Sequence, residues 1–115
     1  MALTSCYQPP ERNCKDFKNG KFQFDYVVDS VQKTGVFTRE GDLSIEYYDN
    51  KIDSSTVRWI NDCEYVVKKI NPKSMAEEKP VHIKILTTTD NSYTFEFNIV
   101  GNSKTKSKAT AIKTD

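Results

Sequence analysis

The residues whose types and spacing could direct a chemical modification stand near the start of the chain, as Leu3-Thr4-Ser5-Cys6. An aliphatic residue, two small residues and a cysteine form the pattern at which a lipoprotein precursor is cleaved and its cysteine acylated. This chemistry would make Cys6 the mature N-terminus and the lipidation site, and would hold the rest of the chain at a membrane. We therefore expect a location in the cell envelope, facing the periplasm or the cell exterior.

The signal before such a cysteine contains an apolar segment, which the bilayer captures before cleavage. Only Met1 and Ala2 precede Leu3 in this sequence. Either the apolar segment of a signal peptide has been removed, or the match is accidental and Cys6 is an ordinary free cysteine. Residues 6 to 20 are rich in proline and charge, and we interpret them as a tether between the lipid and the folded domain.

Three cysteines occur in the chain, which is an odd number for an exported protein. If Cys6 is acylated, Cys14 and Cys63 remain as a pair that could form a disulfide in an oxidising compartment. Such a bridge would close a loop of about fifty residues and stabilise the fold by roughly 4 kcal/mol in the chain-entropy model. The alternative is two separate reduced cysteines, because spacing alone does not show that the two approach each other.

Residues that carry out catalysis are scarce in this sequence. The only histidine, His82, has the parity opposite to Val81 and Ile83, so its side chain is expected to point to solvent. No serine or cysteine stands out as the nucleophile of a triad. A metal site built from Cys14, Cys63 and His82 would lack close ligand spacing and a clear fourth ligand. We expect no catalytic residue, no metal, no cofactor and no enzymatic activity.

Composition limits the remaining classes of function. The 17 lysines and arginines nearly balance the 16 aspartates and glutamates, so no long-range field favours nucleic acid or an acidic partner. The 115 residues suit one domain with a single modest core. Hydrophobic residues make up 37%, and no apolar run approaches the ~20 residues of a membrane-spanning helix. Nucleic-acid binding through an OB-type barrel is disfavoured, and we expect no nucleic-acid partner.

Alternating hydrophobicity begins at Lys21, after which Phe22, Phe24, Tyr26 and Val28 would share one face of a strand. Turn residues separate further segments of this kind. Ser74-Met75-Ala76-Glu77 has the spacing of a capping box and predicts one short helical turn at 74–78. The other predicted strands lie near 31–39, from Leu43 to Tyr47, up to Trp59, from Tyr65 to near Pro72, from Val81 to Ile85, from Tyr93 to Ile99, and near 103–113.

The predicted fold class is all-β, with eight antiparallel strands joined mostly by short turns. Short connections place each strand beside its predecessor, which gives an up-and-down meander. Such a meander buries its apolar face by curling into a barrel or by folding over as a sandwich. We favour the barrel, because closure removes exposed edges. We divide the chain into the lipidation site and tether at 1–20 and a single β-barrel domain at 21–115.

The order of the strands and two sequence stretches resemble small lipocalin-like (calycin-type) barrels. These stretches are Asn19-Gly20-Lys21-Phe22 at the first strand, and Val57-Arg58-Trp59 leading into Asp62-Cys63-Glu64-Tyr65. The resemblance implies an antiparallel barrel that binds a small apolar ligand at its open end.

A second resemblance covers nearly the whole chain. The stretch from Ser5-Cys6-Tyr7 to Cys14, the stretch from Arg58 to Tyr65, and Met75-Ala76-Glu77-Glu78 are similar to a group of small uncharacterised bacterial lipoproteins. This resemblance implies a lipid-anchored envelope protein and carries no established activity.

A set of aromatic side chains could line a pocket for an apolar ligand. More often such a set fills the core, because the interior of an eight-stranded barrel is just wide enough for side chains. The set consists of Phe22, Phe24, Tyr26, Trp59, Tyr65, Tyr93, Phe95 and Phe97.

Lysines alternate along the last predicted strand, at Lys104, Lys106 and Lys108, with Lys113 further on. This row could contact phosphates or anionic lipid head groups. We favour the alternative of a solvated outer strand face, on which lysines deter pairing with another edge.

The function expected from the sequence is that of a membrane-anchored extracytoplasmic lipoprotein acting as a non-enzymatic binding module, with a small apolar ligand as its candidate ligand. The alternative is a structural or protein-interaction component of the cell envelope with a filled barrel. The expected partners are a membrane, through the lipid on Cys6, and a small hydrophobic ligand or an envelope protein. A space inside the barrel would favour the first function, and a filled barrel with an exposed apolar patch would favour the second.

Overall fold

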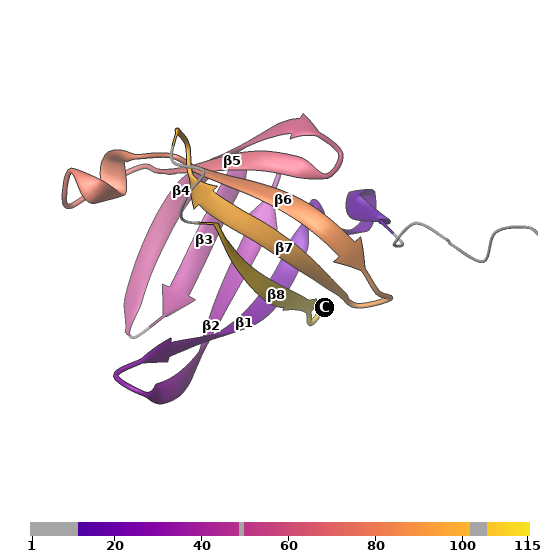
Figure 1. The fold of residues 1–115 in the computed structure, drawn as a ribbon, viewed down its shortest axis with the longest axis horizontal. Helices are drawn as coiled ribbons and strands as arrows, with labels where there is room; N and C mark the ends of the chain where they lie inside the picture. Colours follow the sequence, from indigo (N-terminus) through magenta and orange to yellow (C-terminus); the bar gives the residue numbers. More distant parts are fainter. Residues whose placement is uncertain (1–11, 49, 102–105) are drawn as a thin grey trace, which may run out of the picture.

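The computed structural model describes residues 12–48, 50–101 and 106–115, and for residues 26–28 it describes the backbone only. Eight antiparallel strands follow one another around a closed barrel in chain order, and the last strand pairs with the first (Figure 1). The predicted up-and-down barrel is therefore confirmed, and the sandwich is excluded. The strands are β1 (Gly20–Val28), β2 (Val31–Glu40), β3 (Leu43–Tyr48), β4 (Lys51–Asn61), β5 (Glu64–Lys69), β6 (Val81–Thr88), β7 (Ser92–Ile99) and β8 (Ser107–Lys113).

Short turns connect most successive strands, as the sequence predicted, and each strand therefore lies beside its predecessor. Val28 pairs with Val31, so Asp29 and Ser30 alone connect β1 to β2. Both residues have positive φ, at 52° and 66°, which is the backbone of the two-residue turn whose twist matches that of a hairpin. Aspartate tolerates this conformation because its short polar side chain can bond locally.

Two 3-10 turns lie outside the sheet, η1 (Cys14–Phe17) and η2 (Ala76–Glu78). The predicted capping-box residues form η2, where Ser74 Oγ accepts a hydrogen bond from the Glu77 amide at 3.2 Å. Glu77 Oε1 accepts one in return from the Lys73 amide at 3.1 Å. No helix in the described part of the chain is long and apolar enough to cross a membrane.

Cross-strand register shows which side chains face the inside of the barrel, because directly paired residues lie on the same side of a sheet. Phe22, Tyr65 and Tyr93 are each 2% exposed or less, so they mark the inner face. Following the pairs around the barrel from these residues gives an inward set that includes Phe24, Gly35, Phe37, Arg39, Ser44, Glu46, Asp53, Ser55, Val57, Trp59, Val67, Lys69, Val81, Ile83, Ile85, Phe95, Phe97, Ile99, Ala109 and Ala111.

The two ends of the barrel differ. Figure 1 shows η1 and the C-terminus at one end, which we call the closed end, and the β1–β2 hairpin with η2 at the other. The fully buried side chains cluster at the closed end, where β1 and β5 begin and β2 and β6 finish. Among the described side chains, those that face inward in the other half are mostly half-buried. We call this part of the barrel the open half, because a side chain that faces the inside of a closed barrel stays exposed only where solvent enters.

Candidate functional site

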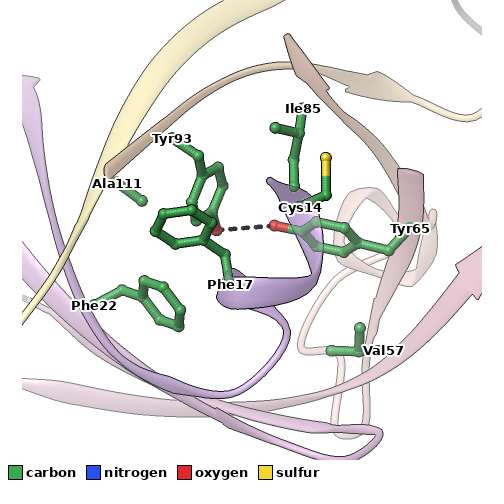
Figure 2. Packing of buried hydrophobic residues seen from close by; sticks show 8 residues of the cluster. All are labelled: Cys14, Phe17, Phe22, Val57, Tyr65, Ile85, Tyr93 and Ala111. Atoms are coloured by element: carbon green, nitrogen blue, oxygen red, sulfur yellow. Dashed lines mark hydrogen bonds between the residues drawn. The ribbon is translucent and has the colours of Figure 1, made fainter. Parts of the chain in front are cut away.

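The closed end is sealed by a segment that precedes the first strand. Phe17 of η1 is fully buried, and its ring packs 5.3 Å from that of Tyr93 and 6.5 Å from that of Phe22 (Figure 2). Cys14, at the start of η1, is 2% exposed. The predicted tether therefore contains a segment, η1, that completes the core, and we call it the plug. Figure 2 shows Phe17 of the plug among buried side chains of the barrel strands.

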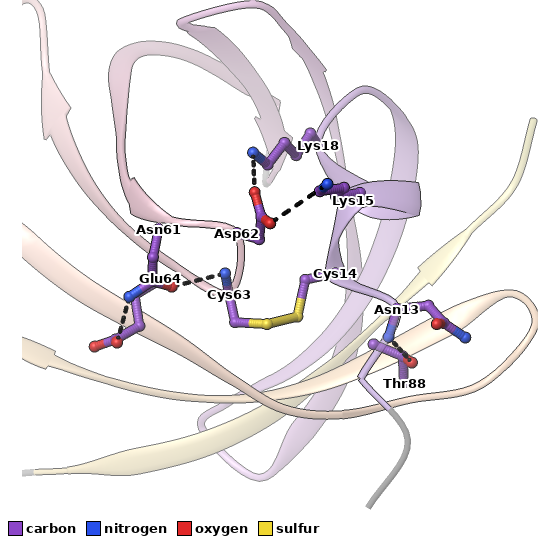
Figure 3. Close-up of a disulfide and its surroundings, with 9 residues drawn as sticks. All are labelled: Asn13, Cys14, Lys15, Lys18, Asn61, Asp62, Cys63, Glu64 and Thr88. Atoms are coloured by element: carbon purple, nitrogen blue, oxygen red, sulfur yellow. Dashed lines mark hydrogen bonds and ion pairs between the residues drawn. A yellow bond between two sulfur atoms is a disulfide. The ribbon is translucent and has the colours of Figure 1, made fainter.

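A disulfide between Cys14 and Cys63 fixes this plug to the turn between β4 and β5 (Figure 3). The Cα atoms lie 5.2 Å apart, a normal separation for a disulfide. Beside the disulfide, Asp62 accepts a hydrogen bond from Lys18 Nζ at 2.9 Å, and its other carboxylate oxygen lies 3.7 Å from Lys15 Nζ. The turn and the plug are therefore joined by these polar contacts as well as by the bridge. The pairing that the sequence left open is thus formed.

One buried cation, Arg39, lies beneath the plug and is 3% exposed. Its guanidinium donates to the carbonyl oxygens of Phe17 and Lys18, the latter at 3.0 Å, and to the hydroxyls of Tyr65 at 3.1 Å and Tyr93 at 3.4 Å. The guanidinium also lies 4.9 Å from the centre of the Phe22 ring. Aromatic faces and oriented carbonyls therefore hold this charge in the interior.

The charge on Arg39 is permanent. Burial by itself lowers the pKa of Arg39, but the hydroxyls of Tyr65 and Tyr93 outweigh it and raise the pKa above its usual value. Burial also raises the pKa of Tyr93 far above its ordinary range, so this hydroxyl stays protonated. The two tyrosine hydroxyls also bond each other, with 3.1 Å between their oxygens (Figure 2).

The open half has one apolar wall. Ile83, Phe95 and Phe97 face inward from β6 and β7 and remain half-buried. The rings of Phe95 and Phe97 lie 5.8 Å apart, and Phe24 lies 5.9 Å from Phe37 on the adjoining strands. An apolar molecule entering this half would remove these faces from water, which is the main driving force for binding such a ligand.

The opposite wall, on β3, β4 and β5, is polar. Asp53 Oδ2 accepts hydrogen bonds from Tyr48 Oη at 2.6 Å and from Lys69 Nζ at 3.1 Å. The bond from Tyr48, followed by that from Lys69, lowers the pKa of Asp53. Glu46 pairs with Asp53 across the strands, and burial raises the pKa of Glu46, with the neighbouring Asp53 charge adding to the effect. This wall could orient a polar group of a ligand.

The aromatic residues proposed to line a ligand site divide between the two halves. Phe22, Tyr65 and Tyr93 belong to the buried core. Trp59 packs against that core, 4.4 Å from the Tyr65 ring. Phe95 also packs against the core, 5.4 Å from the Tyr93 ring, and it borders the open half together with Phe24 and Phe97. A ligand-lining role stays a prediction for these three. The side chain of Tyr26 lies outside the described residues.

The orientation of His82 agrees with its sequence parity. It pairs with Val66 and Asn98 on the outer face of the sheet, and its Nε2 lies 3.0 Å from Glu64 Oε1. A hydrogen bond from Asn61, followed by that from His82, lowers the pKa of Glu64. Within the described ranges, no three His, Cys, Asp or Glu side chains are grouped closely enough to hold a metal ion.

Two other predicted sites are only partly covered by the described residues. Cys6 and Lys104 lie outside them. Lys106 and Lys108 are exposed beside β7, and Lys106 Nζ lies 3.6 Å from Glu96 Oε1. Lys113 donates to the carbonyl oxygen of Asp16 at 3.0 Å, so it serves the closed end.

Comparisons of the chain with protein-family models, with curated proteins and with solved structures found no match. The closed, eight-stranded antiparallel barrel is consistent with a lipocalin-like fold. The likeness to bacterial lipoproteins rests on the sequence alone.

Sequence reasoning missed Phe17 and Arg39. Phe17 stands in a charged stretch without periodicity, and an arginine at the end of a strand is usually exposed. One feature of the sequence could have indicated that Arg39 faces inward, because it has the same parity as Phe37 in the predicted strand 31–39.

Proposed function

We propose that this barrel is a non-enzymatic binding module for a small apolar ligand held in the open half. The observation that supports the proposal is the half-burial of inward-facing apolar side chains, Ile83, Phe95 and Phe97, inside a closed sheet. At the closed end, by contrast, Phe22 has no exposed surface.

The test uses two substitutions at neighbouring positions of β4. Ser55 faces inward in the open half, and Thr56 faces outward and is exposed. Ser55→Phe would place a ring in the space that a ligand needs, whereas Thr56→Phe adds the same ring outside. We expect wild type and Thr56→Phe to enhance the fluorescence of N-phenyl-1-naphthylamine equally, and Ser55→Phe to reduce its affinity at least tenfold. Equal binding by all three proteins, or by none, would contradict the proposal.

The lipid anchor is part of the same proposal, and it is supported by the sequence Leu3-Thr4-Ser5-Cys6. Acylation at Cys6 would hold the binding module at a membrane of the cell envelope. Metabolic labelling with an alkyne fatty acid tests it in cells that express the chain with a bacterial signal segment. Label should be incorporated into wild type and lost in Cys6→Ala. Label retained in Cys6→Ala would show that the lipid, if any, is elsewhere.

A second candidate, an interaction component of the envelope, is favoured by apolar side chains on the outer face. Val36 pairs with Tyr47, and Tyr47 pairs with Ile52, which is 66% exposed. A photoreactive residue at Ile52 should then crosslink one defined envelope protein in cells, whereas the same residue at the outward-facing Thr56 should not. Identical crosslinks at both positions would indicate random encounter.

A further inference from the structure

The disulfide joins the plug to a turn that is itself bonded to the barrel. The Cys63 amide donates to Asn61 Oδ1 at 2.8 Å, and the Cys63 carbonyl oxygen accepts from the Ile85 amide of β6, also at 2.8 Å. Cys63 is therefore held by its own turn and by the neighbouring strand, independently of the bridge. If the bridge opened, the cysteine free to move would be Cys14, at the start of the plug.

Apart from the bridge, the plug is held by one buried ring and a few hydrogen bonds. Phe17 is fully buried, and Arg39 donates to the carbonyl oxygens of Phe17 and Lys18. The bond of Lys18 to Asp62 is exposed, and solvent screens such a pair. Fixing the backbone of one residue costs at least as much free energy as one hydrogen bond contributes net. We therefore expect the bridge to decide whether this short segment stays in place.

A depression of about 390 Å³ lies over the bridge, and both cysteines line it. Its other lining residues are Arg12, Asn13, Lys15, Asp16 and Asp62. Figure 3 shows the bridge between the plug and the β4–β5 turn, with Lys15 and Asp62 beside it. The volume falls within the range of small-molecule sites, so a thiol of low mass fits. Cys63 is half-buried whereas Cys14 is 2% exposed, and we expect a nucleophile in the depression to reach Cys63 Sγ first.

We propose that the Cys14–Cys63 bridge is a redox switch at the closed end. A dithiol reductant opens the bridge by way of the depression, and its opening releases the plug from a barrel that stays folded. The switch goes beyond the proposed function and does not depend on it, because it concerns the end of the barrel opposite the open half. In the oxidised protein the plug seals this end, and in the reduced protein solvent reaches Arg39 and the hydroxyls of Tyr65 and Tyr93.

The reaction is a thiol–disulfide exchange in two steps. A thiolate of the dithiol attacks Cys63 Sγ, the S–S bond breaks, and its electron pair leaves on Cys14 Sγ, which takes a proton from water. The second thiolate of the reductant then attacks the reductant sulfur bonded to Cys63. This step closes a cyclic disulfide in the reductant and releases Cys63 as a thiolate, which is protonated in turn. The bridge gains two electrons and the dithiol loses two.

Hydrogen–deuterium exchange tests whether the plug is released. The full chain carries Cys6→Ser, so that the bridge supplies the only thiols. Reduction with dithiothreitol in native buffer should make the amides of residues 13–19 exchange at least about tenfold faster, while those of β4 keep their protection. The double variant Cys14→Ser/Cys63→Ser is the matched control, and it should exchange like the reduced protein without any reductant.

Two outcomes of this experiment would overturn the switch. Unchanged protection of residues 13–19 after reduction would show that the plug stays in place without the bridge. Equal loss of protection in residues 13–19 and in β4 would show that the whole barrel unfolds, so the bridge would be structural and not a switch.

A second experiment tests entry through the depression. Asn13 is exposed and lines the depression, whereas Asp42 is exposed in the β2–β3 turn and does not line it. In native buffer Asn13→Trp should slow reduction by dithiothreitol at least about fivefold, and Asp42→Trp should leave the rate unchanged, because exchange depends on access to the attacked sulfur. In urea, where the chain is unfolded, the variants and the parent chain should react alike. Equal native rates in all three proteins would overturn this route.

A monothiol identifies the attacked sulfur. Glutathione, quenched with acid at an early time, should be found by mass spectrometry on Cys63. An adduct mainly on Cys14 would overturn attack at Cys63.

Discussion

Removing the disulfide, by replacing Cys14 and Cys63 with serine, should destabilise the barrel strongly. The bridge spans a sequence separation of 49 residues. A loop of that size restricts the unfolded chain by about 4 kcal/mol in the chain-entropy model. A domain of this size has a total stability of roughly 5–15 kcal/mol, so the variant should lose a large part of it.

Urea unfolding followed by tryptophan fluorescence measures this loss. The chain has one tryptophan, Trp59, which packs against Tyr65 at the end of the barrel that the disulfide closes. With a slope of about 2 kcal/mol per M of urea, a loss of 4 kcal/mol lowers the midpoint by roughly 2 M. Cys6→Ser is the control, and its midpoint should equal that of the wild type.

The same measurement tests whether the bridge also positions the plug. Phe17→Ala should cost about 3–5 kcal/mol in the oxidised protein, because the ring is fully buried. If the bridge acts only on the unfolded chain, Phe17→Ala should cost the same in the protein without it. If the plug leaves when the bridge is absent, that cost should fall toward zero. A disulfide loss below about 1 kcal/mol would refute the entropy argument.

Three further substitutions test the interior by the same urea assay. Arg39→Met leaves the carbonyl oxygens of Phe17 and Lys18 without a donor. It should lower the free energy of unfolding by about 3 kcal/mol, since each unsatisfied group costs about 1–3 kcal/mol. An unchanged free energy of unfolding would mean that the cost of desolvating the guanidinium offsets its hydrogen bonds. Gly35→Ala must displace the Phe24 ring and should cost about 1–3 kcal/mol, so a neutral result would disprove the close approach. The folded-state pKa of Glu46 is raised, so its contribution is present below the unfolded pKa and is lost as pH rises through the folded pKa. Glu46→Gln should therefore stabilise the protein at pH 7 and not at pH 3.5. Equal effects at the two pH values would contradict the upward direction of the Glu46 pKa shift.

Most of the sheet could be predicted from the sequence because its alternation has one period and its turns are short. β2 was predicted at 31–39 and ends at Glu40, and Asp29 and Ser30 form the turn before it. Boundaries were less accurate where alternation fades into polar residues. The strand predicted to reach near Pro72 ends at Lys69.

The closed end could not be predicted, because its contacts are between residues far apart in the chain. Cys14 and Cys63 were a possible pair, but only the closed barrel brings η1 to the β4–β5 turn. Phe17 is one aromatic residue in a charged stretch, and nothing local indicates burial. The short β1–β8 pairing is likewise set by the register between strands, which does not appear in either strand's own pattern.

The position of η1 also determines which way the molecule would stand on a bilayer. The Asn13 amide donates to Thr88 Oγ1 at 2.8 Å, so the polypeptide joins the body beside the β6–β7 turn. Cys6 precedes Asn13 by seven residues, and a segment of that length spans at most about 25 Å when fully extended. An acyl group on Cys6 would therefore direct the closed end of the barrel toward the lipid. The open half would then face the aqueous side. If the proposed acylation and the proposed ligand binding both hold, a ligand would enter the open half from the aqueous side.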